Sequence, residues 1–188
     1  MTAPGTAPIP PKPKSELKTR LITGAILTVI TLWSVWAGLY PFACLVLPFS
    51  VLGQHEFQTF AEQKGFRPGR RLSIVMTLVL LAASIFYPAE VVNQLMLFGL
   101  VVTFTVMLLR PEKRVSSLVD ASLTTLGVVY VGWFFSHLLQ LRKLPDGAAL
   151  ITLLLVGSAF TDMGGYFVGR KFGKTKLYPR VSPKKTVE

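Results

Sequence analysis

The chain has 188 residues, of which 51% are hydrophobic and 15% are charged, and its mean hydropathy is +0.53. This composition is too apolar for an ordinary soluble domain of the same length, so it predicts a membrane protein. Lysine and arginine number 20 against nine acidic residues, and the net charge of +11 favours an anionic partner: nucleic acid, anionic lipid or a phosphorylated substrate. The single cysteine, Cys44, excludes an intramolecular disulfide and a metal site built from several cysteines.

The chain begins with a proline-rich, basic segment. Residues 1–19 lack the spacing of apolar residues that builds a core, so we expect a disordered cytoplasmic tail. The first apolar stretch is about 20 residues long, which is too long for the apolar region of a secretory signal peptide.

The remainder, residues 20–188, divides into apolar stretches separated by polar or proline-containing breaks. Because about 20 apolar residues cross a bilayer as a helix, we predict an all-α polytopic membrane bundle of about six transmembrane helices, with both chain ends in the cytoplasm. The predicted spans are 21–40, 42–60, 72–87, 91–109, 118–141 and 148–168, of which the third is the shortest.

The basic residues orient this bundle. With the N-terminal tail in the cytoplasm, 18 of the 20 lysines and arginines lie on the cytoplasmic side, and Arg142 and Lys143 alone lie outside. This bias follows the positive-inside rule. Because the cations lie in short loops at membrane level, anionic lipid or a phosphorylated substrate is a better partner than nucleic acid.

Two acidic residues near the ends of spans have opposite interpretations. Asp120 follows Ser117 at a predicted helix start, where a carboxylate complements the helix dipole, so we expect a structural role. Glu56 lies about one turn from the cytoplasmic end of the second span and either faces a polar cavity or reaches the interface. Its neighbour His55 has no second or third ligand at helical spacing that would make a metal site.

Asp162 lies inside the last span, where an aspartate costs roughly 2.5 to 3.5 kcal/mol at the bilayer centre. At helical spacing, Ser158 and Tyr166 form a polar seam with it, beside a stripe of small residues that includes Gly165 and Gly169. Either this face packs in the bundle with Asp162 as a buried hydrogen-bond partner, or the seam faces a cavity open to the cytoplasm, where the carboxylate binds a cation or a substrate.

A basic segment, "GRKFGKTKLYPRVSPKKTVE", follows this span. Ser182 and Pro183 are typical of a helix start, and Lys184, Lys185 and Thr186 come directly after them. A helix N-terminus with two lysines and two hydroxyl groups is suited to bind phosphate. The alternative is a juxtamembrane segment that binds anionic lipid.

The last 29 residues, "FTDMGGYFVGRKFGKTKLYPRVSPKKTVE", closely resemble a segment of the phosphatidate cytidylyltransferases, also called CDP-diacylglycerol synthases. In that family the segment runs from a membrane Asp through Gly-Arg, Phe-Gly-Lys and Ser-Pro-Lys-Lys-Thr to Glu. The patches "EFQTFAEQKGFRP" and "GVVYVGWFFSHLLQLRKLPDG" are similar to earlier parts of the same family. The resemblance covers most of residues 20–188.

The resemblance implies an enzyme that transfers a cytidylyl group from CTP to phosphatidate, releasing pyrophosphate, with magnesium as cofactor. Two polyanions must approach each other in this reaction, so cations must neutralise the attacking and leaving groups. Asp162, as a magnesium ligand, and Lys184 and Lys185 are then the candidate catalytic residues. The candidate substrate-binding residues are Arg170, Lys174, Ser182, Thr186 and Glu188, and a polar cavity would include Glu56, Ser158 and Tyr166.

Members of that family continue beyond the point that corresponds to Glu188, so the resemblance implies that residues 20–188 are an incomplete catalytic domain. The activity of these 188 residues on their own stays open. Two other interpretations also stay open: a transporter-like bundle whose acidic residues mark an ion path, and a noncatalytic membrane partner. We expect a multi-pass protein of the cell's inner (plasma) membrane, and a homodimer is left open.

Overall fold

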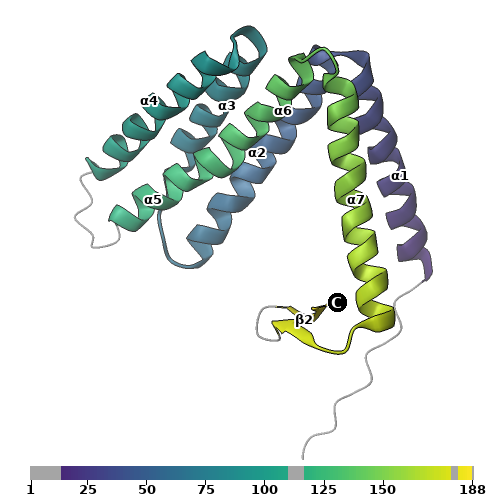
Figure 1. Ribbon diagram of the computed structural model, residues 1–188. Helices are drawn as coiled ribbons and strands as arrows, with labels where there is room; N and C mark the ends of the chain where they lie inside the picture. Colours follow the sequence, from purple (N-terminus) through teal and green to yellow (C-terminus); the bar gives the residue numbers. More distant parts are fainter. Residues whose placement is uncertain (1–13, 110–116, 179–181, 188) are drawn as a thin grey trace, which may run out of the picture.

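The computed structural model describes residues 14–109, 117–178 and 182–187. Its described part is a bundle of antiparallel helical rods followed by a two-stranded hairpin (Figure 1). The helices are α1 (Lys14–Ala37), α2 (Leu39–Gln63), α3 (Arg70–Phe86), α4 (Ala89–Leu108), α5 (Ser117–Gly127), η1 (Val128–Trp133), α6 (Phe134–Lys143) and α7 (Gly147–Phe172). Each of the six predicted spans coincides with one rod, since α5, η1 and α6 are continuous.

The number of rods that cross a membrane stays a prediction. Among the described residues, three rods are long and apolar enough to span a bilayer, namely 89–108, 118–143 and 147–172. A shorter apolar helix covers residues 21–37. These rods, with the apolar outer surface described below, confirm a helical membrane bundle.

Helix α1 begins earlier than the sequence predicts. The proposed disordered tail reached residue 19, whereas helix already starts at Lys14, and residues 1–13 lie outside the described part. Glu16 and Leu17 are good helix formers, so the helix continues beyond the apolar stretch.

The first break between spans also lies elsewhere than predicted. The sequence placed it at Tyr40 and Pro41, but the chain turns at Gly38, whose φ is +134°. This is a conformation that residues with a side chain rarely adopt. Pro41 instead lies in the first turn of α2, where its missing N–H is no loss.

The interior of the bundle is unusually polar and its outer surface is apolar. Fully buried positions include Gln54 and Gln58 of α2, Ser73 and Thr77 of α3, and Thr124 of α5. Large apolar side chains cover the outside of the helices. Lipid tails are as apolar as leucine, so in a bilayer close packing and interhelical hydrogen bonds hold helices together.

Glycines allow this close packing where η1 meets α2 and α3. A Cβ atom at Gly127 would lie 2.7 Å from the side-chain nitrogens of both Gln54 and Gln58. A Cβ at Gly132 would lie 3.1 Å from the backbone Cα of Thr77. Gly127 directly precedes the π-helical turn of η1 and Gly132 lies within it, so the three rods approach one another there.

Two apolar clusters complete the core. One joins α1, α2, α3, α6 and α7 through residues such as Val35, Phe42, Leu81, Leu139 and Ile151. The other joins α3, α4 and η1 around Leu80, Val92, Met96 and Val128.

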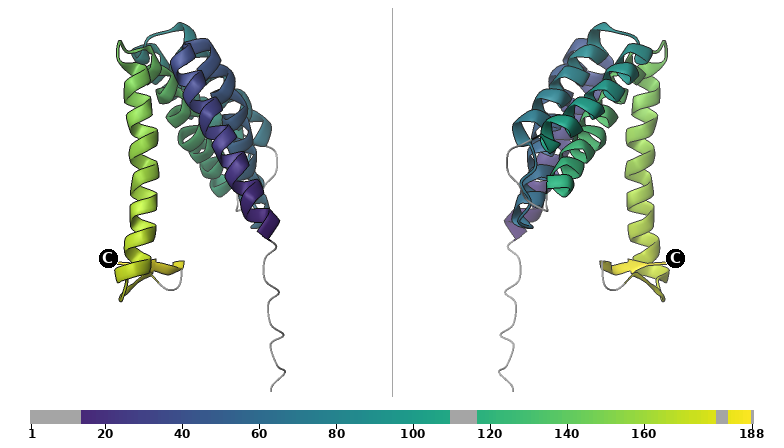
Figure 2. Two further views of the ribbon diagram at one scale, coloured as in Figure 1. Left: turned by 90° about the vertical axis from the view of Figure 1, so that its right-hand side faces the viewer. Right: turned by 90° about the vertical axis from the view of Figure 1, so that its left-hand side faces the viewer.

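Helix α7 belongs to the bundle at its beginning only. It packs against α6 and α1, and of its residues only Gly147 and Ile151 are buried. Towards its C-terminal end it diverges from the other rods, as the side views show (Figure 2). Almost the whole second half of α7 is therefore exposed.

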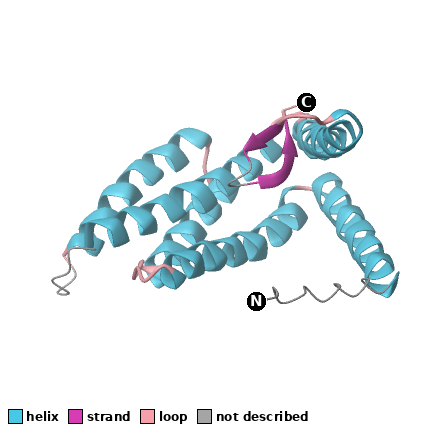
Figure 3. Cartoon of the chain, turned by 90° about the horizontal axis from the view of Figure 1, so that it is seen from below, coloured by secondary structure: helices cyan, strands magenta, loops and turns pink. Residues whose placement is uncertain are grey.

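The segment after α7 corrects one prediction. Ser182–Thr186 is the strand β2, paired antiparallel with β1 (Lys176–Tyr178), and not the start of a helix. The hairpin is drawn in magenta beside the end of α7 (Figure 3). Proline is compatible with the edge of a sheet as well as with a helix start. Backbone pairing with β1 favours the strand over the helix in this segment. The predicted helix start at Ser182 is therefore wrong, and a helix N-terminus does not contribute to phosphate binding by this segment.

Candidate active site

The polar seam of α7 is exposed along its whole length. Asp162, Ser158 and Tyr166 follow one another at helical spacing, as the sequence predicts, and all three are exposed. Asp162 makes no hydrogen bond or ion pair with another described residue. Of the two interpretations of this carboxylate, burial inside the bundle of this chain does not hold.

The basic residues at the end of α7 lie on and just beyond the same helix. Arg170 is exposed, and its Nη1 donates a hydrogen bond of 3.1 Å to the Tyr166 hydroxyl, one turn earlier. Lys174 follows the helix and is exposed. Arg170 and Tyr166 therefore extend the seam of Asp162 towards the hairpin.

The strand β2 brings the backbone of Ser182, Lys184, Lys185 and Thr186 back to the end of α7. Thr186 pairs with Lys176, and Val187 N donates to Thr175 O at 3.0 Å. Asp162 precedes the end of α7, Phe172, by ten residues, about 15 Å along the helix axis. Glu188 lies outside the described residues.

Glu56 is on a different part of the molecule. It is exposed on α2, whose main neighbours are α1, α3, α5, η1 and α6, and α7 diverges from α2 towards the end that carries Glu56. The structure does not place it in a common cavity with Ser158 and Tyr166.

A polar cluster near Glu56 is absent from the sequence predictions. Arg70 at the start of α3 contacts three side chains of α2: its Nη1 donates to His55 Nε2 at 3.0 Å, and its Nη2 contacts Thr59 at 3.1 Å and Glu62 at 2.5 Å. Positions 55, 59 and 62 share one helix face, a spacing that could have indicated the cluster. It closes the turn between α2 and α3.

Asp120 has the structural role that we predicted, although with a different partner. Its Oδ1 accepts a hydrogen bond of 2.8 Å from the backbone N–H of Arg67, in the loop between α2 and α3. Thr124, one turn later, accepts one of 2.7 Å from the N–H of Gly69. Together they fix that loop against α5, and Asp120 is buried.

The donor set for a divalent cation is small. Among the described residues, no group of three or more His, Cys, Asp or Glu side chains could hold a metal ion. Asp162 is the one carboxylate within α7. Mg²⁺ is often bound by one or two carboxylates with substrate phosphates and water as the other ligands, so this set fits an ion that the substrate helps to hold.

Comparison with known proteins covers nearly all of the chain. The model of the Cytidylyltransferase family matches residues 18–188, which include every described helix from the second turn of α1 onward and both strands. The chain belongs to this family. The residues that match the family model include both the helical bundle and the exposed basic end of α7.

Several relatives of this cytidylyltransferase-family chain bear the name phosphatidate cytidylyltransferase. The protein from Bacillus subtilis is 29% identical over 92% of the chain and 65% of its own length, and that from Synechocystis is 27% identical over 92% and 67%. The protein from Staphylococcus saprophyticus is 38% identical over 41% of the chain and 29% of its own length. The chain thus spans about two thirds of the length of the relatives that it matches most fully. No solved structure matches it.

Proposed function

We propose that the chain forms part of a phosphatidate cytidylyltransferase, which transfers a cytidylyl group from CTP to phosphatidate. The observation that carries the proposal is the family match over residues 18–188, together with relatives of that name over 92% of the chain. In this reaction a phosphate oxygen of phosphatidate forms a bond to the α-phosphorus of CTP. The bond from that phosphorus to the pyrophosphate breaks, and pyrophosphate leaves.

The exposed end of α7 and the hairpin after it carry the chemical groups that this reaction would need. Lys184 and Lys185 would neutralise the phosphates of CTP, and the hydroxyl groups of Ser182 and Thr186 would donate hydrogen bonds to them. Because β2 is a strand, these contacts would come from side chains and strand N–H groups rather than from a helix dipole. Arg170, with Lys174, would hold the phosphate of the lipid at membrane level.

Asp162 is the candidate carboxylate for a magnesium ion, and Glu188 stays a candidate for substrate binding. When bound, magnesium would neutralise charge on the reacting phosphates. An aspartate on an exposed face of a membrane helix also needs a polar partner, because an unpaired charge in hydrocarbon is costly. A substrate-bound cation would be that partner.

The test of the lysines uses the whole gene product, purified and assayed for CTP-dependent formation of CDP-diacylglycerol. Lys184→Ala and Lys185→Ala should each reduce kcat by at least tenfold at an unchanged protein level. Lys64→Ala, an exposed lysine of the α2–α3 loop, is the matched control and should retain activity. Full activity of both β2 variants would rule out their role.

The test of Asp162 compares it with the acidic residue at the other end of the same helix. Asp162→Asn should abolish product formation with little change in the thermal unfolding temperature. Asp146→Asn should leave both product formation and the unfolding temperature nearly unchanged. A large loss of folded protein in Asp162→Asn would instead assign this carboxylate to packing between helices.

We further propose that the ends of α2 and α7 face the cytoplasm, in the inner (plasma) membrane. The order of the helices supports a common side for the C-terminal ends of α2 and α7. Arg142 and Lys143, at the end of α6, lie at the opposite end of the bundle (Figure 1). With Cys44 replaced, a cysteine at Lys64 should react with an impermeant maleimide only after the cell is opened, and one at Leu144 in intact cells lacking an outer membrane. A homodimer stays a prediction, for which light scattering of the detergent complex is the measurement.

A further inference from the structure

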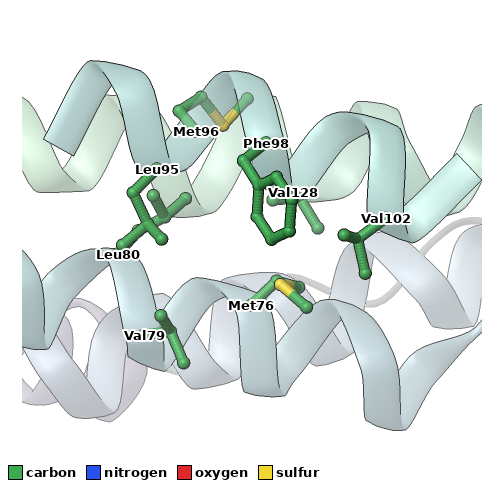
Figure 4. Close-up of a pocket in the computed structure, with 9 residues that line it drawn as sticks. Met76, Val79, Leu80, Leu95, Met96, Phe98, Val102 and Val128 are labelled. Carbon is green, nitrogen blue, oxygen red and sulfur yellow. The ribbon is translucent and has the colours of Figure 1, made fainter. Parts of the chain in front are cut away.

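The bundle contains an apolar cavity between α3 and α4 that plays no part in the proposed chemistry. Its volume is about 120 Å³, and side chains such as Met76, Leu80, Met96, Phe98 and Val128, together with Gly99, line it. In the close-up, side chains of α3 and of α4 face each other across the cavity (Figure 4). Every lining residue is apolar or glycine, so the cavity offers no site for a polar ligand.

The cavity lies at the middle of both helices. Helix α4 has 20 residues, a length of about 30 Å, which matches the hydrocarbon thickness of a bilayer. Gly99 is at the middle of α4, and Met76 and Leu80 lie on either side of the middle of α3. The cavity therefore lies near the bilayer centre, where the methyl ends of the acyl chains meet.

The cavity has a closed floor and an open side. Leu80, Met96 and Val128 are at most 4% exposed, whereas Phe98 is 68% exposed and Val79 is 41% exposed. The rim is continuous with the lipid-facing surface of α4, which includes Leu97 and Val101. In a bilayer this opening meets hydrocarbon and not water.

We propose that this cavity, the α3–α4 groove, binds the methyl-terminal part of one acyl chain from a bilayer phospholipid. A cavity of about 150 Å³ lined by apolar side chains can hold a molecule the size of benzene, so 120 Å³ accommodates a short hydrocarbon segment. Met76 and Met96 have flexible side chains that adapt to such a segment.

This lipid is not the substrate of the proposed reaction. Helix α7, which carries Asp162, packs against α6 and α1, whereas the groove is formed by α3, α4 and η1 on the other side of the bundle (Figure 1). The groove also offers nothing that would read a headgroup. It should therefore accept acyl chains of any phospholipid, and the proposal stands independently of the proposed function.

Gly99 provides the means to close the groove. A Cβ atom at this position would lie 3.8 Å from the Met76 sulfur, an ordinary contact, so a larger side chain can start there and extend into the cavity. Gly99→Phe should fill the groove. Val101→Phe, on the exposed side of the same helix, is the matched control.

The experiment uses the protein in phosphatidylcholine bilayers that contain a photoreactive phosphatidylcholine, with a diazirine either at the methyl end of one acyl chain or near its carboxyl group. After irradiation, mass spectrometry locates the labelled residues. The methyl-end probe should label Met76, Met96 and Phe98 several-fold more than Leu97 and Val101. The carboxyl-end probe should show no such preference.

Gly99→Phe should reduce methyl-end labelling of Met76 and Met96 several-fold, and Val101→Phe should leave it unchanged. If Gly99→Phe does not fold, the comparison of the two probes on the wild-type protein decides the matter alone. Equal labelling of groove residues and outer residues would overturn the proposal. An unlabelled groove would also overturn it, since another protein segment would then cover the groove. Phosphatidate with the same methyl-end probe should label the groove equally, and labelling by phosphatidate alone would overturn the assignment to bulk lipid.

Discussion

At the scale of single residues, the centre of the bundle contains buried polar side chains that a hydropathy pattern does not distinguish from exposed ones. Gln54 is fully buried, and neither atom of its amide makes a hydrogen bond within the described residues. Gln58 donates one of 3.1 Å to Ser73. Both amides pack on Gly127, so the glycine and the glutamines form one unit whose parts come from α2 and α5.

Gly132→Ala should destabilise the protein by about 1 to 3 kcal/mol, because the new methyl group would lie too close to the backbone of α3 at Thr77. Gly24→Ala is the matched control, since nothing lies within 4 Å of its Cβ position and alanine favours helix. Thermal unfolding in detergent measures both. An equal unfolding temperature for Gly132→Ala and wild type would contradict the close approach of η1 and α3.

Asp120→Ala should cost about 1 to 3 kcal/mol, because the N–H of Arg67 loses its acceptor in a partly buried position. Asp120→Asn retains an acceptor oxygen and should lose much less. The same unfolding measurement compares the two variants. If Asp120→Asn lost as much stability as Asp120→Ala, the charge of Asp120, and not its hydrogen bond to the loop, would make the contribution.

At the scale of elements, the two cations on the far side of the bundle have a structural explanation. Arg142 Nε donates a hydrogen bond of 2.6 Å to the carbonyl of Val35 near the end of α1. Lys143 Nζ donates to the carbonyls of Ser84 and Tyr87 at the end of α3. Cations are favourable at helix C-termini, where carbonyl groups lack partners, so these exceptions to the charge bias join three helix ends.

Arg142→Ala should lower stability by about 1.5 to 3 kcal/mol, since it removes a charged donor from a half-buried carbonyl. Arg71→Ala, an exposed arginine at the start of α3, should change stability by less than about 0.5 kcal/mol. Chemical unfolding followed by tryptophan fluorescence distinguishes them, because Trp33 and Trp36 lie close to Val35 in α1. Equal effects would show that the Arg142 bond contributes nothing.

At the scale of the whole molecule, α7 stands apart from the remaining helices. Its contribution to the core is concentrated at its first turns, where Ile151 is 1% exposed and joins the cluster of Val35 and Phe42. The long exposed remainder carries Asp162, Tyr166 and Arg170, and the hairpin with Lys184 and Lys185 follows it. The folded bundle and the candidate site therefore depend on different parts of the same helix.

A chain that ends at Asp146 should still unfold cooperatively in detergent. Helices α1 to α6 and η1 contain every buried member of both apolar clusters except Ile151. Its loss of stability should be similar to that of Ile151→Ala, about 2 to 5 kcal/mol. Tryptophan fluorescence serves as the readout, since all three tryptophans precede α7. Aggregation or a noncooperative transition would show that the rest of α7 also supports the bundle.

The helices could be predicted from sequence because each apolar stretch carries its own signal, and in lipid a helix satisfies its backbone hydrogen bonds locally. The structural role of Asp120 was also accessible, from its place at a helix start. Its partner Arg67 was not, because that contact joins residues 53 positions apart. The spacing of positions 55, 59 and 62 could have indicated a polar face of α2, but its pairing with Arg70 depends on the turn between two helices.

The family was determined by sequence alone, since it resides in the order of the residues over 18–188, and the roles of Asp162, Lys184 and Lys185 stay predictions. The tertiary structure decided how those residues are placed: Ser182–Thr186 is a strand because β1 pairs with it, and α7 is exposed because only its first turns reach the core. It also placed Met76, Gly99 and Val128 around one groove. Local preferences cannot determine such features, because each depends on contacts between segments far apart in the chain.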